Sequence, residues 1–157
     1  MIRPTGPTAS TNAINESLWS TLMNFENVNG DTLKGILGAD GLYRRAAPAN
    51  RSFPYAVMRL NTKRTTNFNA LRKSAKLEVQ IYGRDASQLP TISDAADLCE
   101  QAMNFYVNSC GGGLMFTSDI QRDELPEGSA PVDSETCTIR LAFSLAIWPT
   151  YLTSLTL

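Results

Sequence analysis

The sequence predicts an α+β fold: an antiparallel sheet of four or five strands with two helices packed on one face. Apolar and polar residues alternate over 74–85 and again over 137–147, and this period of two is typical of strands with one exposed face. Residues 11–26 and 88–108 instead carry apolar side chains at helical spacing. Laying both helices on the apolar face of the sheet would bury all four stripes in one core.

Length and composition indicate one globular domain over residues 1–157. A chain of 157 residues buries about 70% of its unfolded surface, which is enough for a self-standing core. Hydrophobic residues make up 43% and charged residues 18%, as in globular proteins. The net charge of −1 gives no overall field that would attract nucleic acid. Any basic surface must therefore be local.

The first ten residues contain two prolines and a glycine, which predicts an extended N-terminal arm. The apolar core of a signal peptide is missing from this region. The longest apolar stretch, around 141–148, is too short to span a bilayer. We therefore expect a protein made in the cytoplasm, with no membrane partner.

The helix predicted over 11–26 has a polar start and one apolar face. Thr11 or Asn12 can cap its first turn, and Asn29-Gly30 marks the turn after it. Four residues form the apolar stripe: Ile14, Leu18, Leu22 and Phe25.

The next elements are shorter. Thr32–Leu37 is predicted as a helical turn that stops at Gly38, and Leu42–Arg45 as a short strand. Phe53–Leu60 reads as a strand with Pro54 at its start, where a missing N–H does least harm to pairing.

The strand over Ser74–Asp85 is predicted to bury Ala75, Leu77, Val79 and Ile81. Asn61–Lys73 joins it to the preceding strand. Hairpin loops usually have two to five residues, so we expect this longer connector to project from the body.

The second long helix is predicted to start near Ser87 and to end before Gly111-Gly112-Gly113. A strand over Leu114–Ile120 and an acidic loop over Asp123–Asp133 should follow. The final strand is predicted to bury one alternating set of side chains: Cys137, Ile139, Leu141, Phe143, Leu145 and Ile147.

The chain contains no histidine, so neither a Ser-His-Asp triad nor an HExxH zinc site can be built. Cys99, Cys110 and Cys137 lack CxxC spacing, and we interpret them as buried, reduced thiols. We expect no enzymatic activity, no catalytic residues and no cofactor.

Three weaker motifs have simpler interpretations. The glycine run follows a helix, whereas phosphate-binding loops precede one, so it is taken as a helix stop. Asp94 and Asp97 suit the positive end of a helix dipole. The acidic loop lacks EF-hand spacing, so we expect a solvated loop and no metal; its residues are Asp119, Asp123, Glu124, Glu127 and Asp133.

The connector between the two central strands is the candidate interaction site. It carries Lys63, Arg64, Arg72 and Lys73, together with the aromatic residue Phe68. One interpretation is a solvated hairpin tip. The other is a contact surface, either for a protein or for nucleic acid that passes nearby.

The order of elements resembles that of the tail-terminator and tail-completion proteins of long-tailed (siphovirus-type) bacteriophages. The resemblance covers roughly 33–148. It is carried by the Phe53-Pro54-Tyr55 strand opening, the strand over Ala75–Arg84 that ends in Ile-Tyr-Gly-Arg, the helix that begins near Leu89, and the late strand pair.

The resemblance implies a structural virion protein of the tail or neck. Such a protein forms a closed ring, expected to be a hexamer, at the head-proximal end of the tail tube and ends tube polymerisation. Its partners would be copies of itself, the tail tube protein and the head-tail connector, and DNA would pass through the ring without specific binding. Another neck or head-tail adaptor, or a small nucleic-acid-binding module, remains as an alternative.

Overall fold

The structure is a computed structural model that describes residues 11–64, 73–104, 107–110, 113–125 and 137–149. The predicted N-terminal arm lies outside these residues. The helices are α1 (Thr11–Asn24), α2 (Leu33–Leu37) and α3 (Leu89–Met103), with a 3-10 turn, Ala86–Gln88, just before α3. The strands are β1 (Leu42–Arg44), β2 (Tyr55–Arg64), β3 (Lys73–Gly83), β4 (Val107–Cys110), β5 (Gly113–Leu125) and β6 (Cys137–Pro149).

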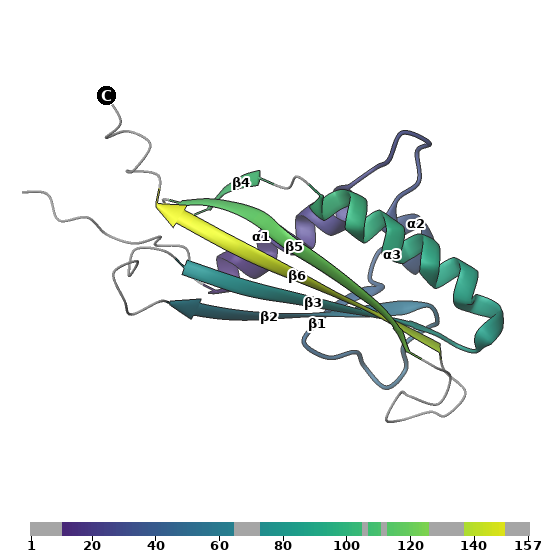
Figure 1. Cartoon of the computed structure of the whole chain (residues 1–157). Coiled ribbons are helices and arrows are strands. Elements are labelled where there is room, and N and C mark those ends of the chain that lie inside the picture. Colours follow the sequence, from purple (N-terminus) through teal and green to yellow (C-terminus); the bar gives the residue numbers. More distant parts are fainter. Residues whose placement is uncertain (1–10, 65–72, 105–106, 111–112, 126–136, 150–157) are drawn as a thin grey trace, which may run out of the picture.

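The described strands form one sheet in the order β1-β2-β3-β6-β5-β4 (Figure 1). β1 is parallel to β2, and every other neighbouring pair is antiparallel. β6 therefore lies between β3 and β5, although it comes last along the chain. β1 and β4 lie at opposite edges.

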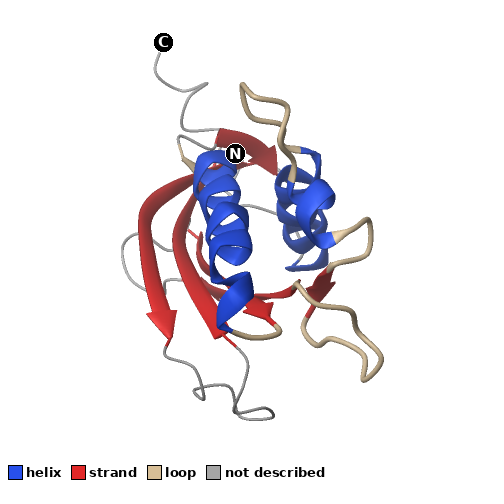
Figure 2. Ribbon diagram, turned by 90° about the vertical axis from the view of Figure 1, so that its right-hand side faces the viewer, coloured by secondary structure: helices blue, strands red, loops and turns tan. Residues whose placement is uncertain are grey.

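All three helices contribute to one core on a single face of the sheet. Figure 2 shows the strands curving around the helices. Ile14, Leu18 and Leu22 of α1 are buried, as predicted. The sheet supplies two alternating sets of buried side chains: Ala75, Leu77, Val79 and Ile81 from β3, and Cys137, Ile139, Leu141, Phe143 and Leu145 from β6. The α+β class and the packing of helices on a mostly antiparallel sheet are confirmed.

The connection from α2 to β1 follows the predicted turn chemistry. The Thr32 hydroxyl accepts a hydrogen bond from the Gly35 amide at 3.0 Å, which caps α2. Gly38 ends the helix with φ 86°, in the region that favours glycine. α2 is thus fixed at both ends by the residues that the sequence indicated.

At Gly83, where β3 ends, the chain passes close to the last strand. A Cβ atom there would lie 2.6 Å from the Cys137 sulfur and 3.1 Å from the Cβ atom of Gln88. Only a residue without a side chain fits between β6 and the turn that leads to α3.

Several boundaries differ from the prediction: α1 ends at Asn24, β2 spans Tyr55–Arg64 and β3 spans Lys73–Gly83. α3 ends at Met103, because Asn104 takes an extended conformation, with φ −67° and ψ 128°. The glycine run is therefore not the helix stop; Gly113 begins β5, and 111–112 lie outside the described residues. Between α3 and β5 lies β4, a strand whose residues the sequence analysis assigned to the helix. With β4 the sheet has six strands instead of four or five.

β5 is also longer than predicted. It continues to Leu125, so Asp123 and Glu124 lie in a strand instead of the acidic loop. A register shift between Thr117 and Asp119 marks a bulge that interrupts its alternation. None of the described helices is both long and apolar enough to cross a membrane.

Candidate interaction surfaces

The candidate hairpin is partly strand. β2 and β3 pair as far as Arg64 and Lys73, which are the last partners in the ladder, and Lys63 pairs with Ser74. Thus Lys63, Arg64 and Lys73 lie together at one end of the β2–β3 pair. Phe68 and Arg72 lie outside the described residues.

A second polar surface lies where α3 faces β5. Arg122 of β5 donates to the Asp97 carboxylate at 2.6 Å and to the Ser93 hydroxyl at 2.8 Å. Glu124 and Glu100 are 3.7 and 3.8 Å from its guanidinium group. One cation therefore joins the helix to the strand through several oxygen atoms.

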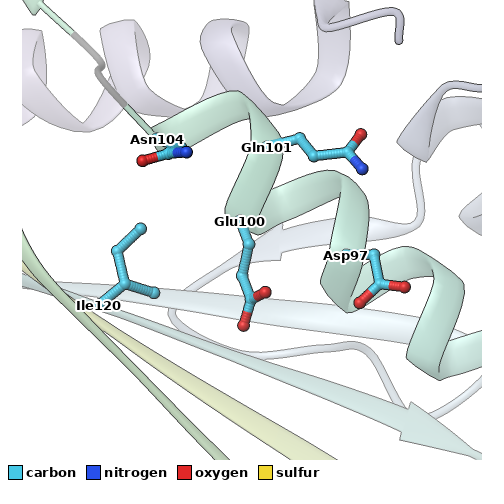
Figure 3. Close-up of a pocket in the computed structure, with 5 residues that line it drawn as sticks. All are labelled: Asp97, Glu100, Gln101, Asn104 and Ile120. Atoms are coloured by element: carbon cyan, nitrogen blue, oxygen red, sulfur yellow. The ribbon is translucent and has the colours of Figure 1, made fainter. Parts of the chain in front are cut away.

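Beside this network is an open recess of about 420 Å³, shown in Figure 3. The labelled side chains of α3 and Ile120 of β5 line it: Asp97, Glu100, Gln101, Asn104 and Ile120. Across α3, Asp94 and Asp97 line another hollow of about 310 Å³ together with Asn27 and Asp31. The exposed side of α3 is therefore acidic.

The sheet face opposite the helices carries an aromatic cluster. The rings of Tyr55 and Tyr82 stack with centroids 4.9 Å apart, and Phe53 is 5.2 Å from Tyr55. The Arg51 guanidinium carbon lies 4.9 Å from the centre of the Tyr55 ring. Tyr43 meets Tyr55 edge to face at 6.2 Å. The cluster fixes the β1–β2 loop against the sheet.

The phenol of Tyr82 in β3 and the thiol of Cys99 in α3 both have raised pKa values, which favour their protonated forms. Burial raises the pKa of Tyr82, and Tyr55 adds to the effect. The Tyr82 hydroxyl also donates to the Gln80 side chain, which in turn donates to Glu78 at 2.8 Å. Burial raises the pKa of the Cys99 thiol to about 12, so this thiol stays protonated at neutral pH and is a poor nucleophile.

Cys99 and Cys137 are buried, as predicted, and the Cys137 thiol donates to the Asp85 carbonyl at 3.0 Å. The predicted burial of Cys110 lies outside what the structure describes. Within the described ranges, no group of three or more Cys, Asp or Glu is placed to hold a metal ion. The described surfaces carry charge pairs, an aromatic cluster and open recesses.

The sequence analysis missed both the Arg122 network and the aromatic cluster. Arg122 and Asp97 are separated by 25 residues along the chain, so nothing in either local pattern connects them. The stacked tyrosines had a usable signal, because Tyr55 lies near the start of one predicted strand and Tyr82 near the end of the next. Pairing of the two strands in register would have brought them together.

These features define a small α+β protein, and comparisons with solved structures support that fold. Neither a protein-family model nor a curated protein sequence matches the chain. Among solved structures, it is similar to a chain in the virion of a native gene transfer agent (GTA) particle. The TM-score is 0.64 at 13% identity, and the match covers 89% of this chain and 98% of that chain.

A second solved structure, whose name states no function, is similar at TM-score 0.60 and 11% identity. The match covers 88% of this chain and 95% of that chain. At these identities the two similarities establish a shared fold over nearly the whole of each solved chain.

Proposed function

We propose that this protein is a structural component of a phage-type virion, and that it forms a closed ring at the head-proximal end of the tail tube. The observation that carries the proposal is the fold shared with 98% of a chain from a gene transfer agent virion. The order of sequence elements, which resembles that of tail-terminator proteins, supports the position in the tail.

The mechanism is physical and makes or breaks no covalent bond. Contact between two unlike surfaces of the same chain builds a ring when the rotation closes, and we propose six subunits. One end of the ring covers the tail tube and stops its growth. The other end presents loops to the head-tail connector. DNA passes through the opening without sequence-specific contacts, and the protein needs no cofactor.

Loss of the gene tests the proposal, because a terminator and an adaptor fail differently. Without a terminator, tube growth has no stop, so electron micrographs should show tails of uncontrolled length. Without an adaptor, tails should have normal length but remain detached from heads. Normal tails already joined to heads would contradict both roles.

Antibody labelling of purified particles locates the protein directly. We expect label at the junction of head and tail and none along the tube. Label on the capsid shell or at the distal tip would overturn the proposed position.

A further inference from the structure

Charge is divided between the two edges of the sheet. From Leu42 to Arg64, a stretch that comprises β1, β2 and the loop between them, there are six Lys or Arg residues and no Asp or Glu. From Asp94 to Glu124, a stretch that contains β4 and most of α3 and β5, there are six Asp or Glu residues and one cation, Arg122. The strand order places β1 and β2 at one edge of the sheet and β4 and β5 at the other. Of the α3 carboxylates, Asp97 and Glu100 approach β5 through Arg122.

Several of these charges face solvent. Arg45 and Arg59 are exposed at the basic edge, as are Asp119 and Glu124 at the acidic edge. Within the described part of the chain, Arg45, Arg59 and Asp119 have no ion-pair partner, and Glu124 has only a 3.7 Å contact with Arg122. Arg59 also donates a hydrogen bond to the Arg45 carbonyl at 3.3 Å, which leaves its charge uncompensated. The charges of these four side chains are therefore accessible to a partner.

Both edges also leave strand backbone unpaired. β1 pairs with β2 only over Ala56–Met58, and β4 pairs with β5 only over Gly113–Phe116. Beyond these points, no described strand covers the outer side of β2 or β5. An open edge with charges of one sign repels the same edge of a second copy. It attracts an edge that carries the opposite charge.

We propose that the basic edge of one copy contacts the acidic edge of a second copy, head to tail. The partner is the chain itself, because a single molecule carries both surfaces, one with exposed arginines and the other with exposed carboxylates. Since salt limits charge interactions to about 8 Å at physiological ionic strength, the edges must come close. The inference rests on the proposed ring and names the surfaces that would join its subunits.

Paired charge reversals test this contact. One variant carries Arg45→Glu and Arg59→Glu, and the other carries Asp119→Lys and Glu124→Lys. Each should weaken self-association about tenfold or more, measured by sedimentation velocity, because like charges then meet. An equimolar mixture should associate again, because every junction in an alternating assembly is once more between unlike edges.

The control variant, Glu26→Lys with Lys34→Glu, reverses two exposed charges outside both edges and should associate like the unaltered protein. Circular dichroism melts check that all variants fold. If both edge variants still formed rings, or if the folded variants failed to recover on mixing, the edge contact would be wrong although the ring could stand. An unaltered chain that stayed monomeric, alone and on tail tubes, would overturn the contact and the ring together.

Nucleic acid is the competing partner for the basic edge. If Arg45→Glu with Arg59→Glu abolished DNA retention but left self-association unchanged, the basic edge would be a nucleic-acid surface and the proposal would fail. Edge-dependent rings that are absent from the head-tail junction would instead support the contact and refute the proposed function.

Discussion

At the residue scale, two leucines differ in how much of their surface the fold removes from water. Leu77 of β3 is 0% exposed, whereas Leu89 at the start of α3 is 36% exposed. We expect Leu77→Ala to lower the free energy of unfolding by about 2–5 kcal/mol, through lost burial and a cavity. The matched change Leu89→Ala should cost about 0.5 kcal/mol or less. Denaturant unfolding of both variants measures the difference, and equal losses would contradict the assigned core.

Tyr82 links the aromatic cluster to alkaline stability. Its pKa is raised in the folded protein, so folding favours the protonated phenol. Its contribution should be complete below the ordinary tyrosine pKa of 10.0 and should be lost as pH rises through the higher folded value. Ultraviolet titration should show one tyrosine that ionises late, and Tyr82→Phe should remove it. The control Tyr43→Phe should retain the late ionisation. If the late ionisation persisted in Tyr82→Phe, the raised pKa would belong to another tyrosine.

At the element scale, Arg122 couples β5 to α3. A double-mutant cycle of Arg122→Gln and Asp97→Asn should give a coupling energy of about 0.5–1 kcal/mol, since both side chains are partly exposed. The pair formed by Arg140 and Asp123 is a suitable comparison, because Arg140 is more exposed than Arg122. That cycle should give a smaller coupling. The reverse order would show that the Arg122 contacts do not hold the two elements together.

Strict alternation made β3 and β6 predictable, because each lies between two other strands and buries one of its faces. The sequence patterns of β4 and β5, at one edge of the sheet, were less typical of strands. The polar end of β5 read as a loop, since an edge strand tolerates charged residues. β4 was hidden because α3 ends at Met103 and is followed by Asn104 instead of a glycine, so apolar residues beyond it prolonged the helical pattern.

At the scale of the whole molecule, the cations at the end of the β2–β3 pair are a second place to test assembly. Lys63→Glu with Arg64→Glu should leave the melting temperature unchanged but slow the joining of heads to tails, because such charges steer association more than they hold a fold. Particle yield in a complementation assay measures this. A normal particle yield would show that the end of the β2–β3 hairpin is only a solvated surface with no role in assembly.

The sequence analysis placed these cations in a connector over Asn61–Lys73, but β2 continues to Arg64 and β3 begins at Lys73, so Lys63, Arg64 and Lys73 lie in the strands. Nothing in the sequence pattern indicated that the acidic residues of β5 lie at the opposite edge. That arrangement follows from the strand order, in which β6 separates β3 from β5. Strand order depends on long-range pairing, which local periodicity does not encode.

The position of β6 has a consequence for synthesis. It pairs with β3 on one side and β5 on the other, and its side chains fill the centre of the core. Until β6 is synthesised, β3 and β5 each have one unpaired edge. The helices can then pack against only part of the sheet. The core can therefore close only after β6 has left the exit tunnel. A nascent chain arrested before that point would expose one unpaired edge on each of β3 and β5 and be prone to aggregation.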